Sequence, residues 1–298
     1  MKYIVPFLDT PMKKIYTKLF DFLEVGDDFP TIIMGVLNLS PESFYQGSVY
    51  SDLSSLEKAT LNMIENGAKM LDIGGRSTAP WSKKITIEEE INRLEPAMEL
   101  VSKSIPEDII ISVDTQYSKI AQIAYDIAKK YKKKIIINDV SCLKTDPTLQ
   151  NFIIEHNLPV ILMASKKVPG DLCTIEEIIK EFQKTIQKLK SHGYDVNKII
   201  LDPGIGKWIE KKEHTYDLKI IGNLRKLRVI QKPILVALSR KSFIGTTLNI
   251  PDPRNRLNGT LSSTAIAIYN GAHIIRTHDV TPQLLEIAKM AEEIRKNQ

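Results

Sequence analysis

Met34-Gly-Val-Leu-Asn-Leu-Ser-Pro-Glu-Ser-Phe44 begins as an apolar run, turns polar at Asn38 and reaches Pro41 three residues later. Ile32 and Ile33 lengthen the apolar run on its N-terminal side. A continuous apolar run that ends in a polar, proline-bearing segment is typical of a buried strand of a parallel sheet that opens into a loop. Because loops at such strand ends carry functional groups, Asn38 is the first candidate site residue.

The same pattern recurs from residue 31 to the C-terminus, where short β-branched runs alternate with longer segments of helical periodicity. This alternation indicates repeated βα units around a parallel sheet. The predicted strands are residues 32–38, 70–73, 109–114, 135–138, 160–163, 199–202, 234–238 and 274–276. Eight strands close a barrel, so the sequence predicts an α/β fold, a single (β/α)8 TIM barrel over residues 31–298.

Residues 1–30 lie outside this pattern and form a predicted N-terminal extension that covers the closed end of the barrel. Residues 12–23 have the apolar spacing of a short amphipathic helix, and residues 26–30 that of a turn. Within the barrel, capping boxes at Ser54, Thr86 and Thr174 predict helix starts. Gly67, Gly193 and Gly271 stand where helices should end before a strand, so we expect a left-handed C-cap at each.

Composition restricts the classes of function. The chain has 298 residues, of which 43% are hydrophobic, and its net charge of +5 comes from lysines scattered among glutamates. No basic stripe with interleaved aromatic residues is present, so we expect no nucleic-acid partner. No apolar run approaches eighteen residues and no signal segment precedes Asp9, which predicts a cytoplasmic protein without a membrane partner. Cys142 and Cys173 lie far apart, which supports neither a disulfide framework nor a zinc site.

Polar or charged side chains follow almost every predicted strand, and in a barrel these ends meet at one mouth. Asp114, Asn138 and Asp202 offer hydrogen-bond acceptors and a donor beside apolar walls, which suits a flat heterocycle with an aminopyrimidine edge. Lys241, Arg276 and His278 add positive charge, which suits a phosphate or diphosphate group. Any one of these residues could merely cap a loop, but the set together predicts a site for a heterocycle joined to a diphosphate.

Eight strings, in their order and spacing, resemble those of dihydropteroate synthase: MGVLNLSPESF, LDIGGRSTAP, ISVDT, IINDVS, DPGIG, SRKSFIG, NGTL and RTHDV. Members of that family are TIM barrels, commonly homodimers, that join 6-hydroxymethyl-dihydropterin diphosphate to 4-aminobenzoate and release diphosphate. The resemblance therefore implies a transferase of folate biosynthesis whose substrates are a pterin diphosphate and an arylamine.

The resemblance also implies roles for individual residues. Asp114, Asn138, Asp202 and Lys241 would hold the pterin, with Arg276 stacking on it. Asn38, Arg276 and His278 would bind the diphosphate, with Mg2+ reached through Asn38, and Thr78 and Ser242 would lie near the arylamine. The leaving diphosphate then needs Mg2+, Arg276 and His278 to take up negative charge, while Asp114 stabilises the cationic pterin methylene. Asp114, Lys241, Arg276 and His278 are thus the predicted catalytic residues.

Three loops depart from the family pattern. Arg76 stands where the family has Glu and Ala79 where it has Arg, and residues 207–212 replace an aromatic-Gly-Lys turn. Residues 164–167 replace His-Met-Gly after the fifth predicted strand. Trp81 and Trp208 fall in altered loops, where each ring either anchors its loop or flanks a larger arylamine.

A larger acceptor, such as the ribosylated aminobenzene phosphate of methanopterin synthesis, would need cations for its extra negative charge. The candidates for this contact are Arg76, Lys166, Lys167 and Lys207. Two other classes of function remain open, a methyltransferase acting on a methylated pterin and a corrinoid protein, and a pterin-binding barrel without catalysis.

Overall fold

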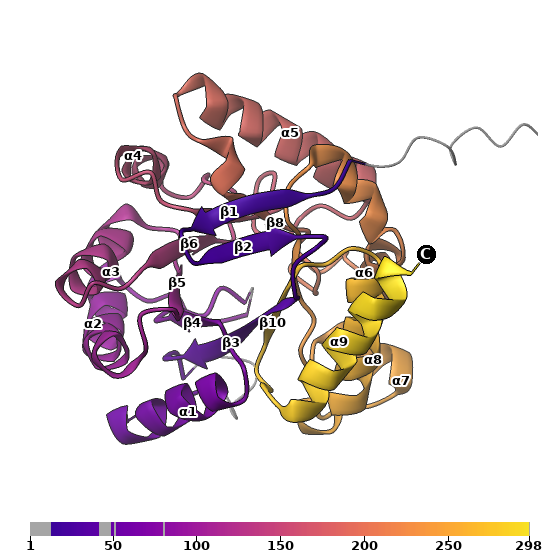
Figure 1. The fold of residues 1–298 in the computed structure, drawn as a ribbon, viewed down its shortest axis with the longest axis horizontal. Coiled ribbons are helices and arrows are strands. Elements are labelled where there is room, and N and C mark those ends of the chain that lie inside the picture. Colours follow the sequence, from indigo (N-terminus) through magenta and orange to yellow (C-terminus); the bar gives the residue numbers. More distant parts are fainter. Residues whose placement is uncertain (1–12, 42–48, 51, 80, 298) are drawn as a thin grey trace, which may run out of the picture.

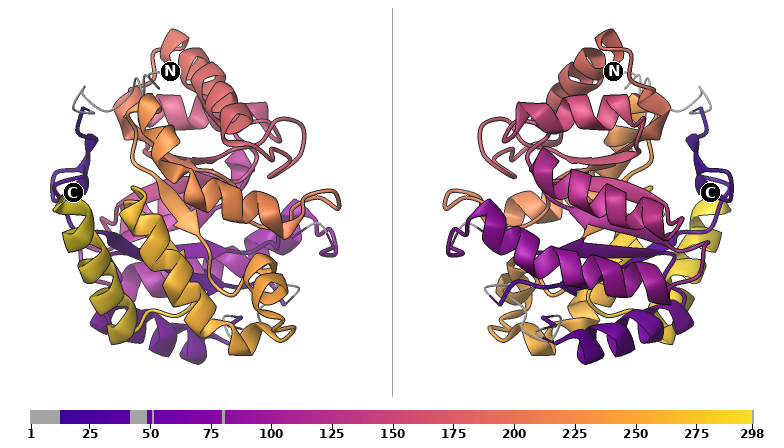
Figure 2. Two further views of the ribbon diagram at one scale, coloured as in Figure 1. Left: turned by 90° about the vertical axis from the view of Figure 1, so that its right-hand side faces the viewer. Right: turned by 90° about the vertical axis from the view of Figure 1, so that its left-hand side faces the viewer.

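The computed structural model describes residues 13–41, 49–50, 52–79 and 81–297. Its main feature is an eight-stranded parallel sheet with the order β8-β7-β6-β5-β4-β3-β10-β9. A parallel bridge between Leu201 and Ile234 joins the two edges of this sheet, which closes the barrel. Helices surround the barrel on the outside (Figures 1 and 2). The predicted (β/α)8 fold is therefore confirmed.

All eight predicted strands are present, and their limits differ from the predicted ones by at most one residue at either end. The strands are β3 (Ile32–Asn38), β4 (Met70–Gly74), β5 (Ile110–Asp114), β6 (Ile135–Asp139), β7 (Val160–Met163), β8 (Ile199–Asp202), β9 (Leu235–Ala237) and β10 (Ile274–Thr277). Their agreement with the apolar runs follows from burial on both faces, because a parallel strand inside a barrel leaves no solvent-facing side.

The helices are α1 (Leu53–Glu65), α2 (Ile87–Ser104), α3 (Ser118–Lys130), α4 (Pro147–Glu155), α5 (Ile175–Ser191), α6 (His214–Gly222), α7 (Ser242–Leu248), α8 (Leu257–Tyr269) and α9 (Pro282–Lys296). In the described part of the chain, the 3-10 helices η2 (Val196–Lys198), η3 (Leu224–Ile230) and η4 (Pro253–Asn255) lie between them.

The capping boxes predicted at Thr86 and Thr174 are confirmed. The box predicted at Ser54 is wrong, because Asp52 caps α1 and its Oδ1 accepts a hydrogen bond from the Ser55 amide at 2.8 Å. Each glycine predicted to end a helix directly follows the C-cap residue, which is asparagine or histidine. Gly67, Gly193 and Gly271 have positive φ angles of 90°, 81° and 104°.

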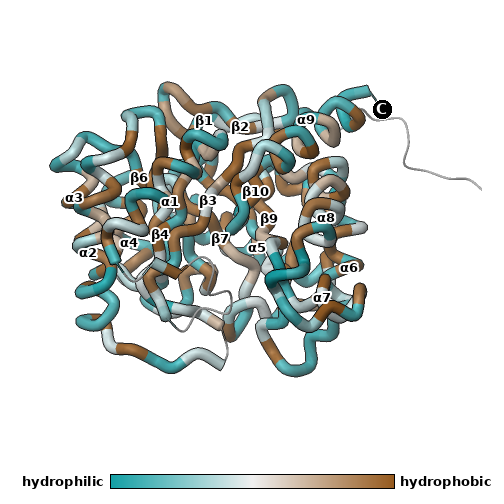
Figure 3. Tube along the Cα trace, turned by 90° about the horizontal axis from the view of Figure 1, so that it is seen from below, coloured by the Kyte–Doolittle hydropathy of each residue, from teal (hydrophilic) through white to brown (hydrophobic). Residues whose placement is uncertain are grey.

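Two apolar layers hold the barrel together. The outer layer lies between the strands and the helices, and the apolar course of the strands is visible in Figure 3. The inner layer fills the end of the barrel at which the strands begin, and consists of Ile32, Met34, Met70, Ile110, Ile136, Ile161, Ile200, Leu235, Ala237 and Ile274, together with Leu19 and Val25. This packing leaves only the opposite end of the barrel, where the strands finish, for a ligand.

Leu19 and Val25 belong to an N-terminal hairpin of β1 (Tyr16–Phe20) and β2 (Leu23–Gly26), which lies across the start of the barrel strands (Figure 1). The helix predicted over residues 12–23 is therefore wrong for the described residues 13–23. Burial alternates along β1, with Thr17 and Leu19 buried and Lys18 exposed between them. A spacing of four residues between apolar positions fits a period of two as well as a helical turn, which explains the error.

A buried ionic cluster ties this hairpin to the last third of the chain. Arg228 donates from both terminal nitrogens to the Asp27 carboxylate at 2.7 Å, and His273 Nε2 lies 3.2 Å from Asp27 Oδ1. The Ile234 amide donates to His273 Nδ1, so the ring proton is on Nε2 and points at Asp27. Although burial opposes ionisation, hydrogen bonds from Arg228 and His273 hold the pKa of Asp27 below its ordinary value.

Candidate active site

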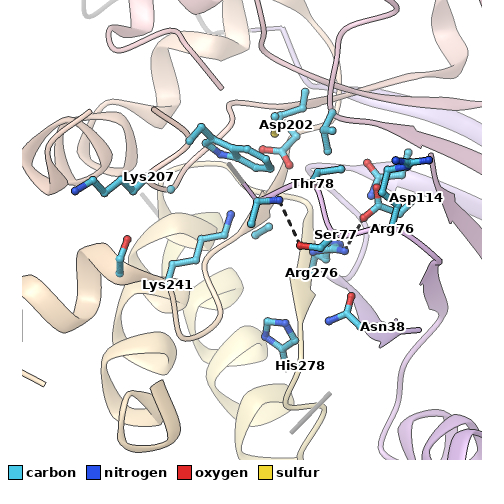
Figure 4. Close-up of a pocket in the computed structure, with 18 of the residues that line it drawn as sticks. Asn38, Arg76, Ser77, Thr78, Asp114, Asp202, Lys207, Lys241, Arg276 and His278 are labelled. Atoms are coloured by element: carbon cyan, nitrogen blue, oxygen red, sulfur yellow. Dashed lines mark hydrogen bonds and ion pairs between the residues drawn. The ribbon is translucent and has the colours of Figure 1, made fainter. Parts of the chain in front are cut away.

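A cavity of about 350 Å³ opens where the barrel strands finish. All nine residues predicted for the site line it, namely Asn38, Thr78, Asp114, Asn138, Asp202, Lys241, Ser242, Arg276 and His278. They come from strand ends and from the loops that follow them, and Figure 4 shows how those it labels converge. The structure thus brings the predicted residues together in one cavity, and the contacts of each side chain decide what the cavity can bind.

Arg276, on β10, is held by two carboxylates at the base of the cavity. Its Nε donates to Asp72 Oδ2 at 2.6 Å, and its Nη2 lies 2.5 Å from the same oxygen and 3.0 Å from Asp114 Oδ2. Asp72 is buried, and its second oxygen accepts hydrogen bonds from Ser112 Oγ and, at 3.1 Å, from Asn138 Nδ2. Asp72 thus fixes the guanidinium without lining the cavity.

Asp114 lines the cavity, and one of its two carboxylate oxygens, Oδ1, is buried and has no hydrogen-bond partner among the described residues. Burial, together with the negative charge of Asp72, raises the pKa of Asp114 to about 8, although Arg276 opposes the shift. A buried polar atom without a partner is costly, so this carboxyl group is suited to a ligand that brings an N–H group or a positive charge.

Asp202 and Lys241 form the second polar pair of the cavity. Asp202 Oδ1 accepts a hydrogen bond from the Gly204 amide at 2.8 Å. Lys241 Nζ donates to the Ile205 carbonyl at 2.6 Å and lies 5.7 Å from the centroid of the Trp208 ring. Burial lowers the pKa of Lys241 to about 8, although the charge of Asp202 opposes the shift.

His278 and Asn38 lie on the side of the cavity formed by β10 and β3 (Figure 4). His278 Nδ1 lies 3.0 Å from Ser239 Oγ. Burial and the charge of Arg276 lower the pKa of His278 to about 3, so the ring is neutral at pH 7 before an anion binds. In the unliganded site the His278 ring therefore acts as a hydrogen-bonding group, and its predicted positive charge at a bound diphosphate stays a prediction.

Arg76 is one of the residues that line the cavity, but its guanidinium group is bonded to protein groups outside the predicted site. Its Nε donates to Glu90 at 2.6 Å, and its terminal nitrogens donate to the carbonyls of Ile85 and Thr86 at 2.7 and 3.1 Å. The guanidinium is thus used to attach the loop after β4 to helix α2.

Two of the remaining candidate cations also lie away from the cavity. Lys166 and Lys167 are exposed and do not line it, whereas Lys207, Trp81 and Trp208 do.

The side chains in the cavity suit a magnesium ion that is bound mainly by substrate oxygens and water. Among the residues that the structure describes, no three His, Cys, Asp or Glu side chains come together as a metal site. Mg2+ commonly keeps several waters and takes one or two protein ligands together with substrate phosphates. The carbonyl oxygen of Asn38, on the wall that also carries His278 and Arg276, fits this mode of binding.

No helix in the described parts of the chain combines the length and the apolar character needed to cross a membrane.

Comparison with known proteins agrees with this geometry. Residues 34–278 match the family model described as pterin binding enzyme. The chain is 35% identical over 265 residues to dihydropteroate synthase from Bacillus subtilis, an alignment that covers 88% of each protein.

Solved structures give the same result. The dihydropteroate synthase of Coxiella burnetii in complex with pteroic acid has a TM-score of 0.81 and 32% identity, covering 95% of this chain and 100% of that one. The enzyme of Xanthomonas albilineans with 4-aminobenzoic acid has a TM-score of 0.79 and 25% identity, covering 95% and 99%.

Proposed function

The chain belongs to the dihydropteroate synthase family of pterin-binding transferases, and from this premise we propose that it condenses 6-hydroxymethyl-7,8-dihydropterin diphosphate with 4-aminobenzoate and releases diphosphate. The observation that carries the proposal is that Asp114, Asn138 and Asp202 line the same cavity as Arg276 and Lys241. One small cavity thus offers acceptors for a heterocycle beside cations for a diphosphate.

The pterin is held by hydrogen bonds from the polar groups at the ends of β5, β6 and β8. Asp114, Asn138 and Asp202 bind the N–H and carbonyl groups of the ring, and Lys241 donates to it. The planar guanidinium of Arg276, held in one orientation by Asp72 and Asp114, stacks on the ring. Since these contacts are formed before substrate binds, the ring is oriented without rearrangement of the barrel.

The departing diphosphate is stabilised by Arg276 and His278, while Asp114 stabilises the positive charge that develops on the pterin methylene. The neutral arylamine nitrogen then forms the new C–N bond as the C–O bond to diphosphate breaks, and it loses its proton to water. When bound through Asn38, Mg2+ supplies additional positive charge at the diphosphate oxygens. No side-chain nucleophile is required.

The Asn38→Ala variant tests the metal-linked role of this residue. It removes one amide oxygen, so we expect kcat for diphosphate release to fall about tenfold or more and the Mg2+ concentration for half-maximal activity to rise. The thermal unfolding midpoint should stay within about 2 °C of wild type, because a single partly buried amide contributes little to stability. Unchanged turnover and Mg2+ dependence would assign Asn38 a structural role alone.

The pH dependence of kcat/KM tests the role of Lys241. Its pKa of about 8 predicts that kcat/KM falls above pH 8, because the neutral amine loses a donor to the pterin. Lys241→Arg keeps the positive charge and should move this decline above pH 10, at a lower absolute rate. If the decline stays near pH 8 in this variant, another group, such as Asp114, causes it.

Plain 4-aminobenzoate fits the second-substrate region better than a phosphorylated acceptor does. The Arg76 guanidinium is hydrogen-bonded to Glu90 and to two backbone carbonyls, and Lys166 and Lys167 lie outside the cavity. Of the cations predicted to contact a larger arylamine, Lys207 alone remains a candidate. Thr78, Ser242 and the Trp208 ring form the proposed arylamine contacts. A higher kcat/KM for the ribosylated aminobenzene phosphate than for 4-aminobenzoate would overturn this assignment.

The proposed function is tested by incubating the protein with the pterin diphosphate, Mg2+ and 4-aminobenzoate. We expect dihydropteroate and diphosphate to form in equal amounts. Pterin binding without diphosphate release for any arylamine would instead favour a non-catalytic barrel. Methyl transfer from a methylated pterin to a corrinoid protein would favour the methyltransferase alternative.

We also propose that the protein forms a homodimer through helices α6 to α9. These helices carry exposed apolar side chains, Leu218, Leu248, Ile266, Tyr269, Met290 and Ile294. The helices are neighbours in the fold, and exposed apolar side chains gathered on one part of the surface can mark an interface. Sedimentation analysis of wild type and Ile266→Asp tests this proposal, since the variant should sediment as a monomer if α8 lies in the interface.

A further inference from the structure

A fully buried lysine lies beneath the cavity and has no part in the mechanism given above. Lys212 has an exposed fraction of 1%, and its Nζ donates to the Gly204 carbonyl at 2.7 Å. Asp217, in the first turn of α6, is also buried, and its Oδ1 lies 3.5 Å from Lys212 Nζ. The same oxygen accepts a hydrogen bond from the Gly206 amide at 2.9 Å. Lys212 and Asp217 do not line the cavity.

The two residues fix the peptide groups on either side of Ile205. Gly204 and Gly206 have φ angles of 72° and 126°, a left-handed region that glycine enters at little cost. Between them the Ile205 carbonyl accepts a hydrogen bond from Lys241 Nζ at 2.6 Å and one from the Trp208 indole at 3.3 Å. The position of this carbonyl therefore determines where the Lys241 ammonium group and the Trp208 ring lie.

The turn has little room to move toward the cavity. A Cβ atom at Gly206 would lie 3.3 Å from Lys241 Cδ and 3.5 Å from Trp208 Nε1. On its other side the Trp208 ring packs against Gly170, where a Cβ atom would lie 2.2 Å from the ring. A shift of the turn would therefore displace the lysine and the indole together.

Burying a lysine is expensive, because the ammonium group loses its hydration. Here the cost is offset by the hydrogen bond to Gly204 and the nearby charge of Asp217. An apolar residue of similar size could fill the space but could not hold a carbonyl group in place. The Lys212–Asp217 pair thus holds the backbone of the turn in place, which an apolar residue that only filled the space could not do.

We propose that Lys212 and Asp217 are positioning residues that hold the 203–208 turn so that the Ile205 carbonyl keeps Lys241 in place for the pterin. The inference rests on the proposed function, since it assigns Lys241 to the pterin site. It adds two residues to the machinery of that site that touch neither substrate.

A purely structural pair and a positioning pair differ in their effect on Lys241. Burial and the charge of Asp202 have the largest effects on the pKa of Lys241. Among the smaller effects, the charge of Asp217 raises this pKa and the charge of Lys212 lowers it. Removal of the Lys212 charge should therefore raise the pKa of Lys241, and removal of the Asp217 charge should lower it. A general loss of stability cannot produce shifts of opposite sign.

The experiment compares Lys212→Met, Asp217→Asn and the matched control Lys211→Met, which alters the neighbouring exposed lysine. We expect kcat/KM for the pterin diphosphate to fall about ten- to hundredfold in Lys212→Met and less in Asp217→Asn, which keeps an acceptor for the Gly206 amide. The basic decline of the pH profile should move to higher pH in the first variant and to lower pH in the second. Lys211→Met should match wild type.

Two controls separate the possible failures. Absence of dihydropteroate formation by wild type and Lys211→Met would refute the proposed function itself. Suppose instead that wild type is active and that the pH profiles of Lys212→Met and Asp217→Asn are either unshifted or shifted in the same direction. This result would refute the positioning role and leave the proposed function intact. If Lys212→Met does not fold, Asp217→Asn decides the question, and a profile unchanged from wild type would overturn the proposal.

Discussion

The Asp72→Asn variant is expected to form dihydropteroate with a kcat/KM about a hundred- to a thousandfold below that of wild type. Asp72 Oδ2 lies 2.6 Å from Nε and 2.5 Å from Nη2 of Arg276. Asparagine keeps the shape of the side chain, but it removes the negative charge and can turn an NH2 group toward the guanidinium. Arg276 would then lose its fixed orientation over the pterin and beside the diphosphate.

Ser112→Ala is the matched control for this prediction. Ser112 donates to the other oxygen of Asp72 and does not touch Arg276, so its loss should change kcat/KM by less than about fivefold. The measurements are steady-state kinetics, the Kd of the pterin diphosphate and circular dichroism of both variants. A folded Asp72→Asn protein with a kcat/KM within fivefold of wild type would show that Asp114 alone is sufficient to orient Arg276.

The Asp114→Asn variant should combine a large loss of activity with a gain in stability. We expect kcat/KM to fall about a hundred- to a thousandfold, because asparagine cannot ionise and so cannot supply the negative charge that stabilises the cationic pterin methylene. The unliganded protein should become more stable at alkaline pH, since burial and the charge of Asp72 make the ionised carboxylate of Asp114 unfavourable. Arg276 would keep its stronger contact with Asp72 in this variant.

The sign of the pH effect follows from proton binding. The pKa of Asp114 is about 8 in the folded protein and near 3.8 in the unfolded chain, so the folded state holds more protons between these values. Its stability therefore declines as pH rises from 4 to 8, and the penalty is complete above pH 8. Asparagine removes this penalty, so its advantage over aspartate should be about 4 kcal/mol greater at pH 9 than at pH 5.

Denaturant unfolding of both proteins at pH 5 and pH 9 measures this difference. An equal change in the free energy of unfolding at the two pH values would contradict the assignment of a raised pKa to Asp114. The result bears on function as well, because an active-site group that destabilises the empty protein is one that its ligand must stabilise.

The barrel was predictable because the signal for each strand is local. A parallel strand buried on both faces needs a continuous apolar run, and polar residues such as Asn38 and Asp202 mark where the run reaches the cavity. The site residues followed from the same signal together with the family resemblance. The hairpin was missed because its short apolar spacing fits two periodicities, and only contact with the inner layer of the barrel decides between them.

The supporting residues of the site were less accessible from the sequence. Asp72 gave a usable signal, because a carboxylate in the middle of the otherwise apolar strand β4 must face a polar partner. Lys212 gave none, since it follows Lys211 in a charged run that looks like a solvated surface. Arg76 was expected to face the substrate, and its true partner, Glu90, lies on a helix fourteen residues further along the chain.

The Asp27 cluster bears on the order in which the molecule assembles. Asp27 is separated by 201 residues from Arg228 and by 246 from His273, so these contacts of the hairpin can form only after β10 has been made. Closing so long a loop is entropically costly and slows folding. During synthesis the ionic contacts that fasten the hairpin therefore wait for the last quarter of the chain, and their formation marks the completion of the barrel.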